Sequence, residues 1–285
     1  MKFVKIFLTL DVFVVLVFNH HWALAQTNFW QQTNGPSGGY IFSLAINSRG
    51  HIFAGTYVGG GFRSLDNGDS WTAVDNRFAN NSFVALVINQ ATGHIFAGTN
   101  AGILRSLDDG DSWAVVKSDL TNNVVQAFAI NSNGHVFAGT VGRGMFRSLD
   151  NGSSWAAVNN GLTNTNVFAL AVNSNGHIFA GTVGSGVFRS LDNGATWTAV
   201  NTGLTTTDVR SLAINSNGHI FAGTLGGGVF RSLDNGSSWT ALNTGFTNTA
   251  VQALAINEVL VKSHQKKLEF LLRRTKEHTN ICYWL

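Results

Sequence analysis

The sequence predicts an all-β repeat protein, a β-propeller with five complete blades and an incomplete sixth. The string S-L-D-x-G-x-[ST]-W occurs five times, with its Trp every 42 residues. The string [IV]-F-A-G-T also occurs five times, at spacings of 41 to 43 residues. Short apolar runs bounded by Asn and Gly turns are typical of antiparallel hairpins. Four such runs in about 42 residues match the size of one propeller blade.

Residues 1–25 have the pattern of a secretory signal peptide. Two lysines precede an apolar run over 6–18, and Ala23 and Ala25 provide the small residues of a cleavage site. The alternative is an uncleaved anchor, but the run is shorter than a typical membrane-spanning helix. We therefore expect a mature chain from Gln26 that has no membrane span and is secreted, periplasmic or located at the cell surface.

The fourth unit shows the four expected strands. They are the runs Val167–Asn173, His177–Val183, Val187–Leu191 and Thr196–Asn201, which are separated by turns that contain Gly. A single four-stranded sheet cannot bury both of its faces alone. The units are therefore expected to stack side by side around a ring.

The repeats end unevenly within the expected propeller domain, residues 26–257. Residues 29–33 resemble a fourth strand, with Trp30 placed 41 residues before Trp71. Residues 251–257 match the first strand of a sixth unit, but the second and third strands do not follow. We expect a sixth blade that holds only a first strand and an N-terminal fourth strand.

The repeated string resembles the Asp-box, or BNR, repeat. This repeat is found in sialidases, sortilin-type receptors, xyloglucan-degrading glycosidases and photosystem II assembly-factor-like propellers. The resemblance covers Trp30–Asn257, and in that family the box is a hairpin between the third and fourth strands, away from the active face.

The resemblance implies a structural role for three residues of each box. The Asp can accept N–H bonds within the turn, the Gly can adopt positive φ, and the Trp can bury its ring. The residues concerned are Asp66, Gly68, Trp71, Asp108, Gly110, Trp113, Asp150, Gly152, Trp155, Asp192, Gly194, Trp197, Asp234, Gly236 and Trp239.

The catalytic residues of a sialidase are not found. Such an enzyme would need an Arg triad, a Tyr nucleophile with a Glu partner and an R-I-P motif, but residues 26–257 contain no Glu and the one Pro follows Gly35. A glycosidase needs two facing carboxylates, and outside the boxes only Asp75, Asp119 and Asp208 remain. We therefore expect no catalysis and no cofactor. A sialidase-like or xyloglucanase-like glycoside hydrolase is the alternative.

One His and one Arg also recur in every unit. A ring of metal-binding histidines is one interpretation, but each blade supplies a single His, whereas a metal needs several ligands within about 2.1 Å. A repeated hairpin residue is favoured, and we expect no metal. The arginines are expected to pair with a neighbouring turn or carboxylate. The residues are His51, His94, His135, His177, His219, Arg63, Arg105, Arg147, Arg189 and Arg231.

Positions that differ between units indicate where a single binding site could lie. They cluster in loops on the face opposite the boxes, and the candidates are Tyr57, Arg77, Lys117, Asp119, Arg143, Asp208 and Arg210. One first-strand position also varies from unit to unit, as Phe42, Val84, Gln126, Phe168, Arg210 and Gln252. Neutral drift is the alternative interpretation. The leading hypothesis is an exported, non-catalytic binding or scaffold module with a protein or glycan ligand, similar to photosystem II assembly-factor-like propellers.

The formal charge of +3 comes from residues 258–285, which carry six basic and three acidic side chains. Nucleic-acid binding is therefore not expected of the propeller. Residues 258–285 are either a basic, helical tail or the product of a frameshift or truncation, and the abrupt change of composition favours the second. An adhesion module of a larger protein is a further alternative function. We expect a monomer unless the open ring associates.

Overall fold

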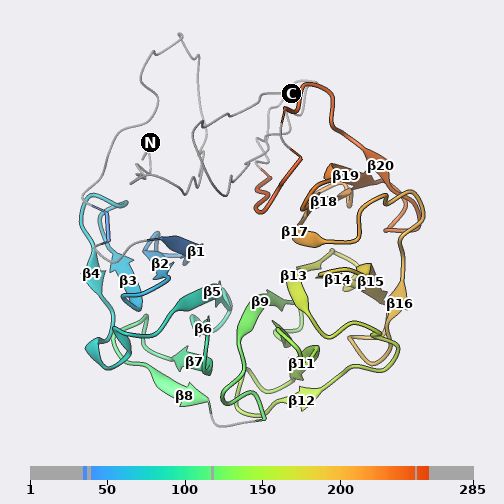
Figure 1. The fold of residues 1–285 in the computed structure, drawn as a ribbon. Helices are drawn as coiled ribbons and strands as arrows, with labels where there is room; N and C mark the ends of the chain where they lie inside the picture. The colour runs from blue at the N-terminus through green and yellow to red at the C-terminus, as the bar shows by residue number, and fades with distance from the viewer. Residues whose placement is uncertain (1–34, 37–39, 117–118, 248, 257–285) are drawn as a thin grey trace.

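The computed structural model describes residues 35–36, 40–116, 119–247 and 249–256. It contains five antiparallel sheets of four strands each, and in every sheet the strands lie side by side in chain order. Figure 1 shows the sheets arranged like blades around a common centre. The fold class is therefore confirmed. The predicted signal peptide, the N-terminal fourth strand and the tail at 258–285 lie outside the described residues.

The strands have the same order in every blade, from the inside of the ring outward. The first strands are β1 (Ile41–Ile46), β5 (Phe83–Ile88), β9 (Val125–Ile130), β13 (Val167–Val172) and β17 (Val209–Ile214). The second strands are β2 (Ile52–Thr56), β6 (Ile95–Thr99), β10 (Val136–Thr140), β14 (Ile178–Thr182) and β18 (Ile220–Thr224). The third strands are β3 (Gly61–Ser64), β7 (Gly102–Ser106), β11 (Met145–Ser148), β15 (Gly186–Ser190) and β19 (Gly228–Ser232).

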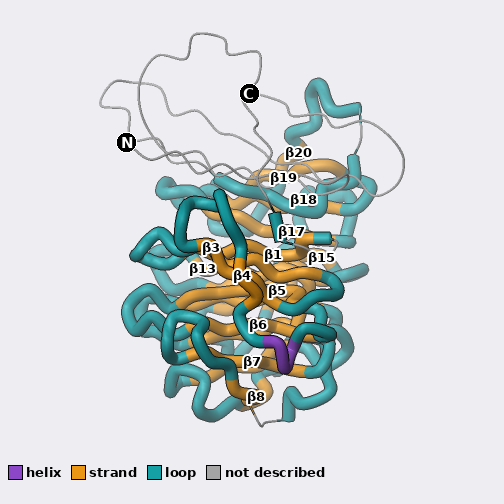
Figure 2. The backbone as a smooth tube through the Cα atoms, turned by 90° about the vertical axis from the view of Figure 1, so that its left-hand side faces the viewer, coloured by secondary structure: helices purple, strands orange, loops and turns teal. Residues whose placement is uncertain are grey.

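The fourth strands form the periphery and are very short. They are β4 (Thr72–Ala73), β8 (Ala114–Val116), β12 (Ala156–Ala157), β16 (Thr198–Ala199) and β20 (Thr240–Ala241). One 3-10 helix, η1 (Asn76–Phe78), lies between β4 and β5 and is the helix visible in Figure 2. The fourth strand of blade four is shorter than predicted, because Thr196 bonds to the box Asp192 and the Trp197 amide donates to a carbonyl of the preceding blade.

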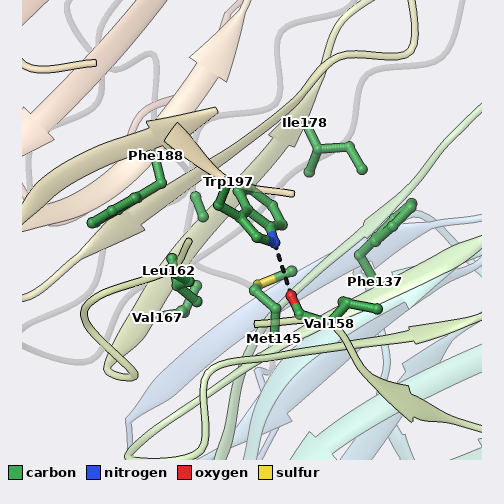
Figure 3. Close-up of a cluster of buried hydrophobic side chains, with 9 residues drawn as sticks. Phe137, Met145, Val158, Leu162, Val167, Ile178, Phe188 and Trp197 are labelled. Carbon is green, nitrogen blue, oxygen red and sulfur yellow. Dashed lines mark hydrogen bonds between the residues drawn. The ribbon is translucent and has the colours of Figure 1, made fainter. Parts of the chain in front are cut away.

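The hydrophobic cores lie between blades. In the core drawn in Figure 3, Phe137 and Met145 of blade three pack with Ile178, Phe188 and Trp197 of blade four. The second strand of every blade is buried along its whole length, because both of its faces are covered. A blade on its own would therefore expose the apolar surface that holds it to its neighbours.

A glycine in the second strand permits this close packing. In blade four, a Cβ at Gly181 would lie 2.6 Å from Cγ1 of Val209, which opens the first strand of blade five. Any larger side chain would force the two blades apart. The Gly in [IV]-F-A-G-T is therefore required by contact between neighbouring blades.

The box hairpin is held together by its Ser and Asp side chains. In blade four, the Ser190 hydroxyl donates to Asp192 at 2.8 Å and accepts the Gly194 N–H, also at 2.8 Å. The second carboxylate oxygen of Asp192 accepts the Thr196 hydroxyl at 2.5 Å. The other four boxes repeat these bonds, which agrees with the role that the resemblance implies.

A second set of polar contacts joins the boxes of blades two to five to the preceding blade, and we call it the joint latch. Its acceptor is the box residue after the Asp, which has φ between 54° and 60° in Asp109, Asn151, Asn193 and Asn235. The preceding blade contributes one Arg, one Asn and one His to each acceptor.

The latch between blades four and five shows these contacts. The Arg189 guanidinium donates to the Asn235 carbonyl at 2.7 Å, the Asn173 amide donates to Asn235 Oδ1 at 2.9 Å, and Nδ1 of His177 lies 2.9 Å from Asn235 Nδ2. The predicted pairing of the repeated arginines with a neighbouring turn is confirmed for Arg63, Arg105, Arg147 and Arg189. Each of the four latches contains one His, so these histidines lie in four separate blade joints.

Residues 249–256 continue the pattern beyond blade five without forming a regular strand. The Val251 N–H donates to the Thr224 carbonyl at 2.8 Å, and Val251 packs against Phe221 and Val229. Val251 therefore meets blade five as Val209 meets blade four. This segment occupies the position expected for the start of a sixth blade.

The box aspartates predict a dependence of stability on pH. Hydroxyl and backbone N–H donors lower the pKa of Asp66, Asp150, Asp192 and Asp234 from 3.8 to about 2. Because the folded pKa lies below the unfolded value, this stabilisation is present above pH 4 and is lost as the pH falls toward 2. Melting temperatures measured by circular dichroism between pH 2 and 6 should fall in that window. In a variant with all four changed to Asn, the fall should be smaller, and an equal fall would contradict the prediction.

The box tryptophans predict unequal effects of the same substitution. The indole Nε1 of Trp197 donates to the Val158 carbonyl of the preceding blade at 2.8 Å, whereas the buried Nε1 of Trp155 has no hydrogen-bond partner among the residues that the structure describes. Trp197→Phe should therefore destabilise the protein by about 1 kcal/mol more than Trp155→Phe. Urea unfolding of the two variants measures the difference, and equal losses would show that the indole bond contributes nothing.

Candidate binding face

The candidate residues lie at one end of the blades, where second strands end and first strands begin. We call this end the loop face; the box hairpins lie at the opposite end. Tyr57 follows β2, Arg143 follows β10, and Asp208 and Arg210 lie at the start of β17. Arg77 lies in η1 and Asp119 in the loop before β9. Lys117 lies outside the described residues.

Each first strand is irregular at one residue near the loop face. In blade four Val167 pairs with Thr182 and Ala169 with Gly181, so Phe168 has no partner of its own in the register. The same shift occurs in the other four blades. A bulge of this kind turns a side chain out of the regular alternation of a strand. The bulged residues are Phe42, Val84, Gln126, Phe168 and Arg210, the first-strand residues that vary between units.

Blade one presents exposed aromatic side chains on the loop face. Tyr57 is 52% exposed and Phe42 is 37% exposed, and their rings meet edge to face with centroids 5.4 Å apart. Tyr40 is 48% exposed, and its carbonyl accepts the Tyr57 N–H at 2.9 Å. Tyr40 was not among the predicted residues, although its position varies between units and is the one that Asp208 occupies in blade five.

Blades four and five hold an arginine side chain, Arg210, in an ion pair at the start of an innermost strand. The Arg210 Nε lies 2.6 Å from Asp208 Oδ1, and the guanidinium carbon lies 4.7 Å from the centroid of the Phe168 ring. The guanidinium is thus held between a carboxylate and an aromatic face. Phe168 and Arg210, from neighbouring first strands, are in contact, so two of the variable bulge residues form one surface.

Arg77 and Asp75 contribute mainly to the joint between blades one and two. Asp75 caps η1 by accepting the Arg77 N–H at 2.9 Å, and the Arg77 guanidinium binds Asp75 at 2.6 Å and the Trp113 carbonyl at 3.0 Å. The Arg77 side chain holds the pKa of Asp75 below its ordinary value. Asp75 is therefore ionised at neutral pH, which does not suit a proton donor.

The three carboxylates considered for glycoside hydrolysis lie in three different blade joints. Asp75 and Asp208 each form an ion pair with an arginine two residues later, while Asp119 lies in the loop before β9. In the described ranges no group of three His, Cys, Asp or Glu side chains could hold a metal ion. No helix in this part of the chain is long and apolar enough to cross a membrane.

No protein-family model matches the sequence, and none of the curated proteins matches it. Solved structures do match. An ancestral GH74 enzyme aligns with a TM-score of 0.63 and 21% identity, over 79% of this chain and 34% of that chain. The extracellular domain of a putative hybrid two-component system from B. thetaiotaomicron aligns with a TM-score of 0.66 and 19% identity, over 82% and 32%. YCF48 bound to a D1 peptide aligns with a TM-score of 0.59 and 18% identity, over 79% and 73%.

These similarities show a β-propeller fold. The chain spans about a third of the length of the GH74 enzyme and of the sensor protein, and about three quarters of the YCF48 chain. The same fold thus occurs in an enzyme, in a protein solved with a peptide and in a putative two-component system. Such a fold does not determine function, which depends on the side chains that it presents.

Proposed function

We propose that this chain is an exported, non-catalytic binding propeller that recognises a protein or a glycan through its loop face. One observation carries the proposal. The same bulge in every blade presents a different side chain, namely Phe42, Val84, Gln126, Phe168 and Arg210. A repeated backbone with changing side chains is what a single asymmetric ligand would need.

The aromatic side chains of blade one are the best candidates for ligand contact. Exposed rings such as Tyr57 and Phe42 can stack on a sugar or cover an apolar side chain of a peptide, and Tyr adds a hydroxyl for hydrogen bonding. The residue that corresponds to Tyr57 is Asn100, Val141, Val183 or Leu225 in the other blades. Blade one therefore differs from the rest at the exposed position that follows F-A-G-T.

The structural neighbours support a binding role more directly than a catalytic one. YCF48 was solved with a D1 peptide, and much of its chain is covered by the alignment. The structural similarity to a GH74 enzyme is consistent with the glycoside-hydrolase alternative. Catalysis is less well supported, because Asp75 and Asp208 already neutralise arginines in separate joints. Export remains part of the proposal and rests on the sequence of residues 1–25.

A binding screen tests the proposal and predicts the effect of one substitution. The full-length protein is applied to a glycan array and a peptide array, and a ligand should bind on at least one. Tyr57→Ala should weaken that binding roughly tenfold or more, as expected for an aromatic contact residue. Leu149→Ala is the matched control, because Leu149 is 56% exposed but lies in the box of blade three.

Three outcomes of this screen would count against the proposal. Binding to neither array would remove its support, and an equal loss in Tyr57→Ala and Leu149→Ala would move the site away from the loop face. Release of sugars from a bound glycan, abolished by Asp75→Asn, Asp119→Asn or Asp208→Asn, would establish the hydrolase instead.

A further inference from the structure

The latch between blades one and two differs chemically from the latches between blades two and five. We call the box residue after the Asp the latch residue; it is Asp109 in blade two, but Asn151, Asn193 and Asn235 in blades three to five. In each latch, a His of the preceding blade faces this side chain through Nδ1. A carboxylate only accepts hydrogen bonds, whereas a primary amide also donates them. The two kinds of latch therefore require different protonation of the same His.

In the joint between blades two and three, backbone donors fix the direction of the amides. The Ala91 N–H donates to Asn89 Oδ1 at 3.1 Å, so the Asn89 NH2 group faces the next blade and donates to Asn151 Oδ1 at 3.1 Å. The Asn151 NH2 group then faces the other way, with its Nδ2 2.5 Å from His94 Nδ1 and 3.1 Å from Thr92 Oγ1. Nδ1 of His94 therefore accepts a hydrogen bond and carries no proton.

The next two joints have the same arrangement. Asn131 and Asn173 are oriented by backbone N–H groups, and each donates to Oδ1 of the latch residue at 2.9 Å. The amide nitrogen of the latch residue lies 3.1 Å from His135 Nδ1 in one joint and 2.9 Å from His177 Nδ1 in the other. These two histidines therefore also contact their latch in the neutral form.

The joint between blades one and two has the opposite requirement. Asp109 Oδ2 lies 2.7 Å from His51 Nδ1 and 3.3 Å from Arg49 Nη1. Arg63, which pairs with Asp111 at 2.8 Å, donates to the Asp109 carbonyl at 2.6 Å. Because the carboxylate has no proton to donate, His51 Nδ1 must carry one. A second proton, on Nε2, adds a positive charge beside Asp109 and leaves this hydrogen bond intact.

The charged groups around the three neutral histidines are arginines. Burial, and then the positive charge of Arg105, lower the pKa of His94 from 6.5. Arg147 and Arg189 bind the carbonyls of the latch residues that the other two histidines contact. Among the residues that the structure describes, no carboxylate forms an ion pair with these three histidines. Because the folded pKa of His94 is lowered, the stabilisation by its neutral form is present above pH 6.5 and is lost as the pH falls below it.

From this chemistry we propose that the latches form a pH-sensitive device in which protonation has opposite effects on neighbouring joints. In acid, a proton on Nδ1 of His94, His135 or His177 faces the NH2 group of an amide, and the hydrogen bond between the two blades is lost. The joint of blades one and two stays closed, because Asp109 accepts a hydrogen bond from the histidine cation. Blades two to five thus loosen from one another while the first two blades remain joined.

Exchange of single latch residues tests the device in the full-length protein. Melting temperatures are measured by circular dichroism at pH 7.5 and 5.0, within the range where histidine titrates and above the range where the box aspartates do. The protein should melt at a lower temperature at pH 5.0. Asn151→Asp gives His94 a carboxylate and should reduce this fall by about 2 to 4 °C, whereas Asp109→Asn should enlarge it similarly. Asn122→Asp is the matched control, because Asn122 is an exposed residue with φ of 64° outside the latches.

Two measurements on the unchanged protein read the joints directly. At pH 7.5, two-bond 1H–15N spectra should show Nδ1 without a proton in His94 and with a proton in His51. Between pH 7.5 and 5.0, hydrogen exchange corrected for its intrinsic rate should show lost protection in the boxes of blades three to five but not in the box of blade two. A proton on Nδ1 of His94 at pH 7.5, equal losses of protection in all four boxes, or equal effects of Asn151→Asp and Asn122→Asp would overturn the proposal. None of these measurements involves a ligand, so this proposal and the proposed role of the loop face fail independently.

Discussion

Every other feature of this structure depends on the contact between one blade and the next. The apolar side chains of a blade are buried by a neighbour, as Phe137 and Ile178 show across the joint of blades three and four. Two further constraints act at the same joint: a glycine lets the next first strand approach, and the latch binds the next box. The apolar packing, the glycine contact and the latch all act between the same pair of blades. A substitution in any of them therefore affects both sheets.

This arrangement explains why the two ends of the molecule differ in sequence variation. The box end must satisfy the same latch at each joint, so its Arg, His, Asn and Asp recur with the repeat. At the loop face the backbone is constrained by the bulge, but the bulged side chain takes no part in the strand register. Phe168 and Arg210 can therefore differ at equivalent positions without any cost to the sheet.

The repeat made most of the fold predictable, because the spacing of the box Trp and of F-A-G-T defines both the unit and its strands. The role of the repeated arginines was also predictable as pairing with a neighbouring turn. The bulge was not, since nothing in a run such as Val167–Val172 marks a register shift. The use of Arg77 in a blade joint was missed as well, although its spacing from Asp75 is shared by Arg210 and Asp208. Tyr40 could have been found by the same comparison between units that selected Asp208, because the two residues occupy equivalent positions.

The location of the cores between blades has a consequence for how such a molecule can change over generations. When every joint is built from the same residues, duplication or deletion of one 42-residue unit creates no new kind of interface. The number of units can then vary by recombination within the gene, while each new neighbour already fits. What such an event changes is the order in which the individual loop-face side chains follow one another around the axis. Copy number thus becomes a source of new recognition surfaces that requires no new packing solution.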